Sequence, residues 1–347
     1  MSTFFDDVTT AAAIAIQQHS HRLLTLPIVV VYLNNICDSR CQTCSIWKNN
    51  EFLKEPAQRQ MSDDLLARLY TFLREWQPRQ VLVSGGEPAL HPRFTEVIDN
   101  LAAFTPKVSL ITNGLLLASL AAQAIEKIAD FYISFDAPDR ETYKTIRGVD
   151  GFEKLAAGMA RLRTIAPKPA IVARCTLQRD NVRLIPELVG AAKRMGFDSI
   201  SFLGVDINSD SFSRDVHGMT NVSGTLPSRD DLEKMANDVD AISATPDGFI
   251  EGGVEKLQQI LHYFHALLGD TGFPPTRCNA PWVSVVVQTS GKIRGCFFQR
   301  VMGDIDSING KDAVAFRRSL NVRNDSICER CVCSKWLGPR DVMRMVD

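Results

Sequence analysis

The sequence has no excess of basic charge and no long apolar run. Its 39 Lys and Arg residues are matched by 40 Asp and Glu residues, which leaves a net charge of −1 over 347 residues. A nucleic-acid backbone is held by a surplus of basic side chains, so a nucleic-acid partner is disfavoured. The apolar stretch Pro27–Leu33 is only long enough for a strand, and the first residues lack the basic segment of a signal peptide. We therefore expect neither a membrane span nor a secreted protein.

Internal repeats and low-complexity tracts are also missing. The length allows one large domain and a smaller one, with a sizeable core. Cysteine, by contrast, is plentiful: there are nine, an odd number, and most fall in clusters. Such clusters favour metal ligation in a reducing compartment over a disulfide framework, so we expect a cytoplasmic protein.

The densest cluster is Cys37-Asp-Ser-Arg-Cys41-Gln-Thr-Cys44, a C-x3-C-x2-C run that directly follows the apolar segment Ile28–Leu33. A loop that leaves a strand can gather three thiolates around one metal centre. On a four-iron cluster, three thiolates leave one iron without a protein ligand, and chemistry can take place there. A zinc site more often shows paired C-x2-C arms.

This run resembles the signature of the radical S-adenosylmethionine (SAM) enzymes. The resemblance implies that Cys37, Cys41 and Cys44 hold a 4Fe–4S cluster whose open iron binds the amino and carboxylate groups of SAM. It further implies a reductant such as flavodoxin or ferredoxin, and cleavage of SAM to a 5′-deoxyadenosyl radical. That family commonly has an aromatic residue just before the third cysteine, near the adenine. Here that position is Thr43, and Ile46 or Trp47 can supply the apolar surface instead.

Strand-like and helix-like segments alternate along the next part of the chain. Strands are predicted at Ile28–Leu33, Val81–Val83, Val108–Thr112, Phe131–Phe135, Ala170–Leu177 and Ser199–Leu203, and helices at Ser62–Glu75, Phe94–Phe104, Ala118–Ile128, Gly151–Ile165 and Ile185–Met195. Repeated βαβ units predict an α/β fold, with a parallel sheet or a partial (β/α)6 barrel and with the helices on the outside. The radical SAM enzymes have a partial barrel of this type. In such folds the site lies at the carboxyl ends of the strands.

Four regions are expected along the chain. A helix within 1–26 precedes the barrel at 27–205, and helices at Ser228–Ser243 and Gly253–Leu268 follow within 206–275. The polar stretch Asp206–Pro227 is either a mobile linker or a lid over the site. It holds four candidates for polar contacts or a proton acceptor: Asp206, Asn208, Asp210 and His217. A small cysteine-rich α+β domain is expected at 276–347.

A second motif, Gly85-Gly86-Glu87-Pro88, follows the predicted strand Val81–Val83. Two glycines permit close backbone approach to a ligand, and the proline stiffens the turn. By itself the motif could be any tight turn. The motif lies one βα unit after the three cysteines. In that position it resembles the radical SAM motif that binds the amino group of the methionine part of SAM.

Polar residues also end the following strands. The resemblance assigns SAM contacts to four of them: Thr112, Asn113, Ser134 and Asp136. A turn at Asn113 or a helix cap at Asp136 would explain these residues equally well. Arg174 interrupts an apolar strand and, like Arg147, is a candidate for the SAM carboxylate, although an edge arginine that reaches solvent remains open.

The carboxyl-terminal cysteines form a second set. Cys278 precedes a predicted hairpin that ends at Cys296, and Cys328 and Cys331 form a C-x2-C arm. Four thiolates suit either zinc or an iron–sulfur cluster. The pattern resembles the "twitch" half of the SPASM-type domains of radical SAM enzymes, which implies one auxiliary 4Fe–4S cluster on these four residues. Cys333 is then spare, or exchanges with Cys331.

Cys175 and Cys333 are candidates for a catalytic thiol that donates a hydrogen atom to a substrate radical, although a small buried residue is the simpler explanation for each. The resemblance favours oxidation of a small polar substrate such as a sugar or aminocyclitol to a carbonyl, with epimerisation or dehydration as close alternatives. Modification of a ribosomally made peptide is the next alternative. Fewer than thirty residues precede the first strand, which argues against a fused peptide-recognition domain. A non-catalytic iron–sulfur electron carrier is a distant third.

Overall fold

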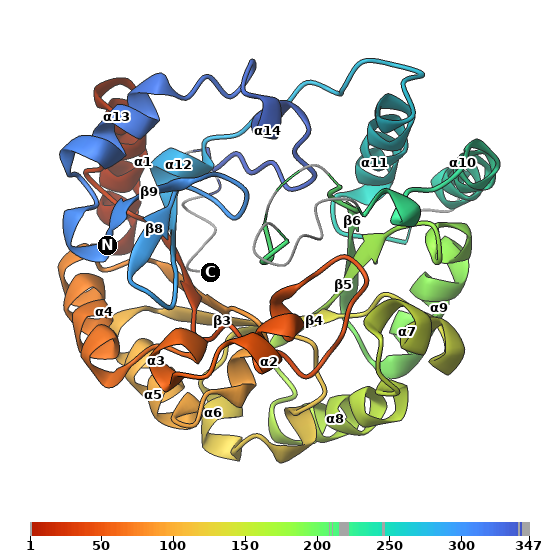
Figure 1. Cartoon of the computed structure of the whole chain (residues 1–347), viewed down its shortest axis with the longest axis horizontal. Helices are drawn as coiled ribbons and strands as arrows, with labels where there is room; N and C mark the ends of the chain where they lie inside the picture. Colours follow the sequence, from red (N-terminus) through yellow and green to blue (C-terminus); the bar gives the residue numbers. More distant parts are fainter. Residues whose placement is uncertain are drawn as a thin grey trace.

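The computed structural model describes residues 2–207, 209, 211–214, 222–244, 247–338 and 341. Its centre is a curved nine-stranded sheet in the order β6-β5-β4-β3-β2-β1-β7-β8-β9. Figure 1 shows this sheet as an incomplete ring, with helices packed along its outer side. The fold is therefore the predicted α/β partial barrel.

The first six strands follow the predicted order and are all parallel. They are β1 (Ile28–Tyr32), β2 (Gln80–Ser84), β3 (Lys107–Thr112), β4 (Asp130–Ser134), β5 (Ala170–Leu177) and β6 (Ser199–Gly204). Their continuous runs of apolar and β-branched residues suit strands that are covered on both faces. Because the strands run in one direction, their carboxyl ends meet at one rim of the barrel.

Helices connect these strands, and the longer ones lie on the outer side of the sheet (Figure 1). They are α2 (Asn49–Phe52), α3 (Pro56–Arg59), α4 (Asp63–Trp76), α5 (Phe94–Phe104), α6 (Ala122–Glu126), α7 (Arg140–Arg147), α8 (Phe152–Ile165) and α9 (Ile185–Met195). Ser62 caps α4 by accepting a hydrogen bond from the backbone N–H of Leu65, as predicted for an N-cap serine. Helix α7, which is two turns long and lies between Asp139 and Gly148, was not predicted from the sequence.

Beyond the barrel, the described helices are α1 (Ser2–Ser20), α10 (Arg229–Ala244), α11 (Gly253–Leu267), α12 (Ala280–Val283), α13 (Lys311–Ser319) and α14 (Ser326–Glu329). In this described part, no helix has the length and apolar character needed to cross a membrane.

The carboxyl-terminal part extends the same sheet. The predicted hairpin is present as β7 (Ser284–Val287) and β8 (Lys292–Arg294), which pair antiparallel, and β9 (Val301–Asp304) adds a further antiparallel strand. In addition, β7 pairs in parallel with β1, from Ile28 opposite Ser284 to Val31 opposite Val287. The segment that carries the second cysteine set is thereby joined directly to the strand that precedes the first set.

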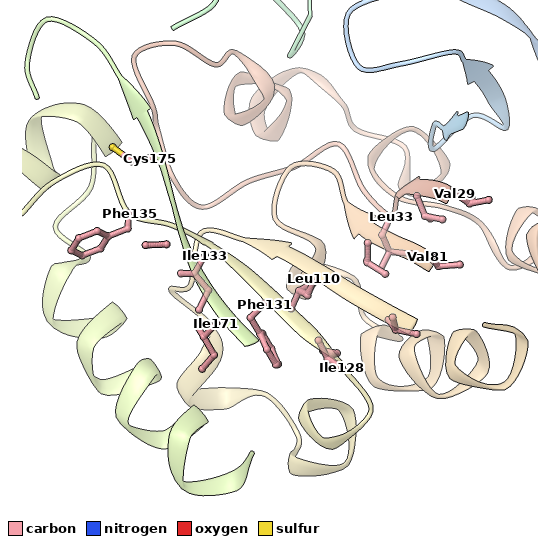
Figure 2. Close-up of a cluster of buried hydrophobic side chains, with 14 of the residues drawn as sticks. Val29, Leu33, Val81, Leu110, Ile128, Phe131, Ile133, Phe135, Ile171 and Cys175 are labelled. Atoms are coloured by element: carbon pink, nitrogen blue, oxygen red, sulfur yellow. The ribbon is translucent and has the colours of Figure 1, made fainter. Parts of the chain in front are cut away.

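The main apolar core lies between the sheet and its outer helices. Figure 2 shows part of it, with Val29, Val81, Leu110 and Phe131 supplied by successive strands. Cys175 belongs to this cluster and is fully buried. Successive side chains of a strand point to opposite faces, so its neighbours Arg174 and Thr176 project to the other side of β5, into the barrel.

Candidate functional site

A cavity of about 270 Å³ lies at the carboxyl ends of the barrel strands. It brings together segments that are far apart in the sequence. Its walls include most of the predicted site residues: Cys37, Cys41, Cys44, Gly85, Gly86, Thr112, Asn113, Ser134, Asp136, Arg147, Arg174 and Cys333. We call this space the cysteine cavity.

The loop with the three cysteines is held by the end of α7. The backbone N–H of Arg40 donates to the carbonyl of Arg147 at 2.8 Å, and that of Gln42 donates to the carbonyl of Ile146 at 3.2 Å. Gly148 follows with φ +67°, and a Cβ there would lie 2.4 Å from the carbonyl oxygen of Arg40. A side chain at position 148 would therefore push this loop away from the helix.

The three thiols face a largely dehydrated space. Burial and the nearby charges of Glu87 and Cys41 raise the pKa of the Cys37 thiol. Burial also raises the pKa of Cys41, against the lowering effect of Arg147, and the pKa of Cys44 to about 12. All three cysteines are free of disulfides. A metal centre that binds them must displace their protons.

Glu87 is fully buried and does not line the cysteine cavity. Its carboxylate accepts hydrogen bonds from the hydroxyl of Thr112 and the backbone N–H of Asn113, both at 2.8 Å. Burial raises its pKa to about 7, although these hydrogen bonds oppose the shift. Glu87 thus ties the end of β2 to the end of β3, and Pro88, also buried, lies outside the cavity lining.

Gly85 and Gly86 bring the same turn close to the cysteine loop. The backbone N–H of Gly86 donates to the carbonyl of Asn34 at 2.9 Å, and that of Glu87 donates to the carbonyl of Ile36 at 2.8 Å. A Cβ on Gly86 would lie only 2.0 Å from the carbonyl oxygen of Ile36. The glycines are therefore required for the turn to pack against the loop, whatever ligand they also face.

Asn113 links the β3 end to the cysteine loop. Its side-chain amide donates to Asp38 Oδ1 at 2.6 Å and lies 3.7 Å from the sulfur of Cys37. Its side-chain oxygen Oδ1 accepts from the backbone N–H of Leu115. Asn113 thus combines the turn that the sequence suggested with a contact to the first cysteine.

A buried ion pair crosses one wall of the cavity. Arg147 Nη1 donates to Asp136 Oδ2 at 2.9 Å, and the other carboxylate oxygen of Asp136 accepts from the backbone N–H of Thr176 at 2.7 Å. The Nε atom of Arg147 is buried without a hydrogen-bond partner among the described residues. Ser134 and Arg174, which are paired across β4 and β5, lie on the same wall.

The cavity has aromatic walls that the motifs did not predict. They are Tyr32 at the end of β1, Phe212 in the segment after β6, and Phe297 and Phe298 after β8. Thr43 and Ile46 also line the cavity, whereas Trp47 does not. No motif marks these aromatic residues, because they come from segments that are far apart in the sequence.

Part of the polar stretch after β6 lines the cavity, through Asp206, Phe212 and Arg214. Arg214 is buried, donates to the backbone carbonyls of Asp206 and Ser211, and forms an ion pair with the Asp206 side chain. The carbonyl of Phe212 accepts from the N–H of Ser45, next to the third cysteine. Of the predicted polar candidates, Asp206 lines the cavity, and Asn208, Asp210 and His217 lie outside the described residues.

The carboxyl-terminal cysteines also gather. Burial and the nearby thiols of Cys278 and Cys333 raise the pKa of Cys296 to about 11, against hydrogen bonds from the backbone of Phe298 and Gln299. Burial and the charges of Cys333, Cys296 and Cys278 raise the pKa of Cys331. The sulfur of Cys328 accepts from the amide of Gln299 at 3.3 Å. Among the described residues, no group of three or more His, Cys, Asp or Glu side chains is arranged around a single metal ion.

The two predicted catalytic thiols lie in different environments. Cys333 lines the cysteine cavity, 3.6 Å from Nη2 of Arg174. Cys175 lies in the apolar core, 3.7 Å from the amide of Asn181, and burial raises its pKa well above the usual value. The structure thus brings Cys333, and not Cys175, to the space that the three other cysteines share.

Comparisons with known proteins match this geometry. The family model of the Radical SAM superfamily matches residues 31–179, which include the cysteine loop and the ends of β1 to β5. Residues 31–179 form a radical SAM domain. The radical SAM family implies a 4Fe–4S cluster and SAM.

Curated relatives match only parts of their length. The PqqA peptide cyclase of Gluconobacter oxydans is 25% identical over 237 residues, which cover 67% of this chain and 60% of the relative. The GTP 3′,8-cyclase of Chlorobaculum tepidum is 31% identical over 145 residues, which cover 40% of this chain and 41% of the relative. The chain thus spans about half the length of the curated relatives it matches.

Solved structures share the fold over a longer range. Streptococcus suis SuiB bound to the precursor peptide SuiA aligns with a TM-score of 0.62 at 16% identity, covering 96% of this chain and 79% of that one. Native anSMEcpe with bound AdoMet aligns with a TM-score of 0.61 at 15% identity, covering 88% and 86%. At these identities the likeness establishes the radical SAM type of fold.

The residues of the radical SAM domain fit its implied cofactors. Three disulfide-free thiols on one loop supply a suitable donor set for an iron–sulfur cluster. The cavity beside them is lined by Arg147 and by the half-buried turn of Gly85 and Gly86, which suit the polar groups of SAM, and its aromatic walls suit the adenine.

Proposed function

We propose that this radical SAM protein abstracts a hydrogen atom from a carbon of a polar substrate held in the cysteine cavity. One observation carries the proposal: a single cavity joins three free thiols, the polar strand ends and a further thiol, Cys333. A 4Fe–4S cluster with SAM at its open iron supplies a carbon-centred radical when both are bound. Cys37, Cys41 and Cys44 would hold that cluster.

The residues of this chain position the reactants. Arg147 presents a cation that Asp136 fixes in place, suited to a carboxylate. Arg174 offers a second cation beside Cys333. Tyr32, Phe297 and the segment 211–214 cover the cavity and limit the access of water, which protects a radical from side reactions.

Cys333 is the thiol that could complete a redox-neutral reaction. Donation of its hydrogen atom to a substrate radical would break the S–H bond, form a C–H bond and leave a thiyl radical. One electron and one proton, from an external reductant such as flavodoxin or ferredoxin, would restore the thiol. Oxidation to a carbonyl requires no such donor, because the substrate radical would instead lose a proton and pass its second electron to the proposed auxiliary cluster.

The second set of thiols is proposed to hold an auxiliary 4Fe–4S cluster. Cys278, Cys296, Cys328 and Cys331 would supply four ligands, and the hydrogen bond from Gln299 to the sulfur of Cys328 is typical of iron–sulfur surroundings. With four protein ligands such a cluster has no open iron for a substrate.

Two substrate classes remain in the proposal. A small polar molecule such as a sugar or aminocyclitol suits the limited volume of the cavity. A ribosomally made peptide is the second candidate, and the PqqA peptide cyclase and the SuiB complex with its precursor peptide favour it.

The experiment is the iron and sulfide content per chain after anaerobic reconstitution, with 5′-deoxyadenosine formation measured in parallel. Wild type should hold about eight irons, and the Cys37/Cys41/Cys44→Ala variant about four, with SAM cleavage abolished. Cys175→Ala is the matched control, because it removes a cysteine of the apolar core. This variant should hold as much iron per chain as wild type. Unchanged SAM cleavage in the triple variant would overturn the proposal.

A further inference from the structure

A second cavity of about 260 Å³ adjoins the cysteine cavity. The two share four wall residues, Tyr32, Ile46, Phe212 and Phe297. The remaining walls come from the segments after β1, from β7 and β8, and from the segment 211–213. A molecule held here would therefore lie directly beside the space that the three thiols face. We call it the Arg294 cavity.

Arg294 is the charged residue of this cavity. The other polar wall residues are neutral amides and hydroxyls, and no aspartate or glutamate is among its described lining residues. Arg294 ends β8, where it is opposite Val286 of β7, while its neighbour Ile293 is buried in the core. The strand thus fixes the direction of the arginine side chain toward the cavity wall.

The side chain of Arg294 is half-buried. Its Nε atom is buried and makes no hydrogen bond, and no ion pair of Arg294 is found within the described part of the chain. Arg147 and Arg317 also have one buried nitrogen each without a hydrogen bond, but both have other partners: Arg147 pairs with Asp136, and Arg317 donates to two backbone carbonyls. A half-buried cation that lines a cavity without acidic residues among its described walls favours an anionic ligand there.

We propose that the Arg294 cavity binds a carboxylate of the substrate. One guanidinium balances one negative charge, whereas a phosphate dianion would leave a second charge uncompensated in a neutral cavity. The planar fork of arginine also matches the two oxygens of a carboxylate. The aromatic side chains of Tyr32 and Phe297, whose ring centroids are 5.9 Å apart, lie between this anchor and the cysteine cavity.

This inference rests on the proposed function and narrows its substrate. A carboxylate at Arg294 would place the carbon skeleton along the shared wall, toward the cysteine cavity. The substrate is then an acid, either a small acidic molecule or a peptide with an acidic group near the reacting carbon. A neutral sugar or an aminocyclitol would leave Arg294 without a partner.

The test uses the anaerobically reconstituted protein and three probes, with affinity measured by calorimetry. Benzoate carries a carboxylate on a ring that suits the aromatic wall, benzamide is its neutral analogue, and inorganic phosphate is the alternative anion. Benzoate should bind wild type at least tenfold more tightly than benzamide or phosphate. Arg294→Gln should reduce benzoate affinity at least tenfold. Lys292→Gln, which removes an exposed cation from the same strand, should not change it.

The inference would be overturned if wild type bound benzoate and benzamide with equal affinity. This comparison uses wild type alone, so it does not depend on whether a variant folds. Equal benzoate affinity in wild type and Arg294→Gln would overturn it as well. Formation of 5′-deoxyadenosine by wild type is measured separately. Its absence together with Arg294-dependent benzoate binding would contradict the proposed function and leave the carboxylate site supported.

Discussion

Arg147 and Asp136 form an ion pair of 2.9 Å beneath the cysteine loop, with side chains that are 11% and 5% exposed. The backbone of Arg147 holds Arg40, while its side chain faces Cys41 and the cavity. One residue therefore supports the loop from outside and presents a positive charge inside. Asp136 keeps that charge in place and is itself fixed by the N–H of Thr176.

Replacement of Asp136 by asparagine should destabilise the fold. The substitution leaves the Arg147 cation buried without its partner, and loss of one member of a buried ion pair costs about 3–5 kcal/mol. The free energy of unfolding in urea measures this loss. Asp150→Asn is the matched control, because it removes an exposed partner of Arg140, and its effect should be much smaller. Equal losses in the two variants would contradict the role given to Asp136.

Gly148→Ala should disturb the cysteine loop as well as the helix end. Gly148 and Gly196 both end helices with positive φ, +67° and +87°, so alanine at either position costs about 1–2 kcal/mol in backbone strain. A Cβ at 148 also meets the carbonyl of Arg40, whereas a Cβ at 196 meets no atom within 4 Å. We expect Gly148→Ala to lose about 1–3 kcal/mol more and to bind less iron after reconstitution. Full iron content in Gly148→Ala would show that the loop does not depend on this contact.

Glu87 should make stability depend on pH. Its pKa rises from 4.5 to about 7 on folding, so between these values the folded state binds more protons than the unfolded state. The free energy of unfolding should therefore fall as the pH rises from 4.5 to 7, by about 3 kcal/mol from this group. Urea unfolding of the iron-free protein at several pH values measures the slope. Glu87→Gln should flatten the slope, while Glu96→Gln, on the surface, should not. Parallel curves for wild type and Glu87→Gln would refute the shift.

The sequence predicted the barrel well because its signals are local. The strand Ala170–Leu177 and the helix Ile185–Met195 have the predicted bounds, since each is an apolar run or an amphipathic period between clear ends. Helix α7 was missed because it spans only eight residues, and its buried face is reduced to Tyr143, Ile146 and Arg147. Short helices give too few turns for a periodic pattern to be distinguished.

The parts of the site that depend on distant pairing could not be predicted. Nothing in the local pattern of Ser284–Val287 indicates that it joins β1, yet that pairing brings Phe297 and Arg294 to the cavities. The Gly-Gly-Glu-Pro motif also gives no sign that the Glu87 carboxylate accepts hydrogen bonds from Thr112 and Asn113, because these partners follow a different strand. A motif identifies residue types and spacing, and only the packing shows which atoms remain available.

Cysteine substitutions should separate the auxiliary ligands from the cavity thiol. If Cys278, Cys296, Cys328 and Cys331 hold the auxiliary cluster, Cys296→Ala should lower the iron content from about eight to about four per chain. Cys333→Ala should keep about eight, because Cys333 faces Arg174 and the cysteine cavity. Solvent hydrogen incorporated into a redox-neutral product should be lost in Cys333→Ala, while SAM cleavage continues. If instead Cys333→Ala loses about four irons, Cys333 is a cluster ligand, and its proposed role as a hydrogen-atom donor is wrong.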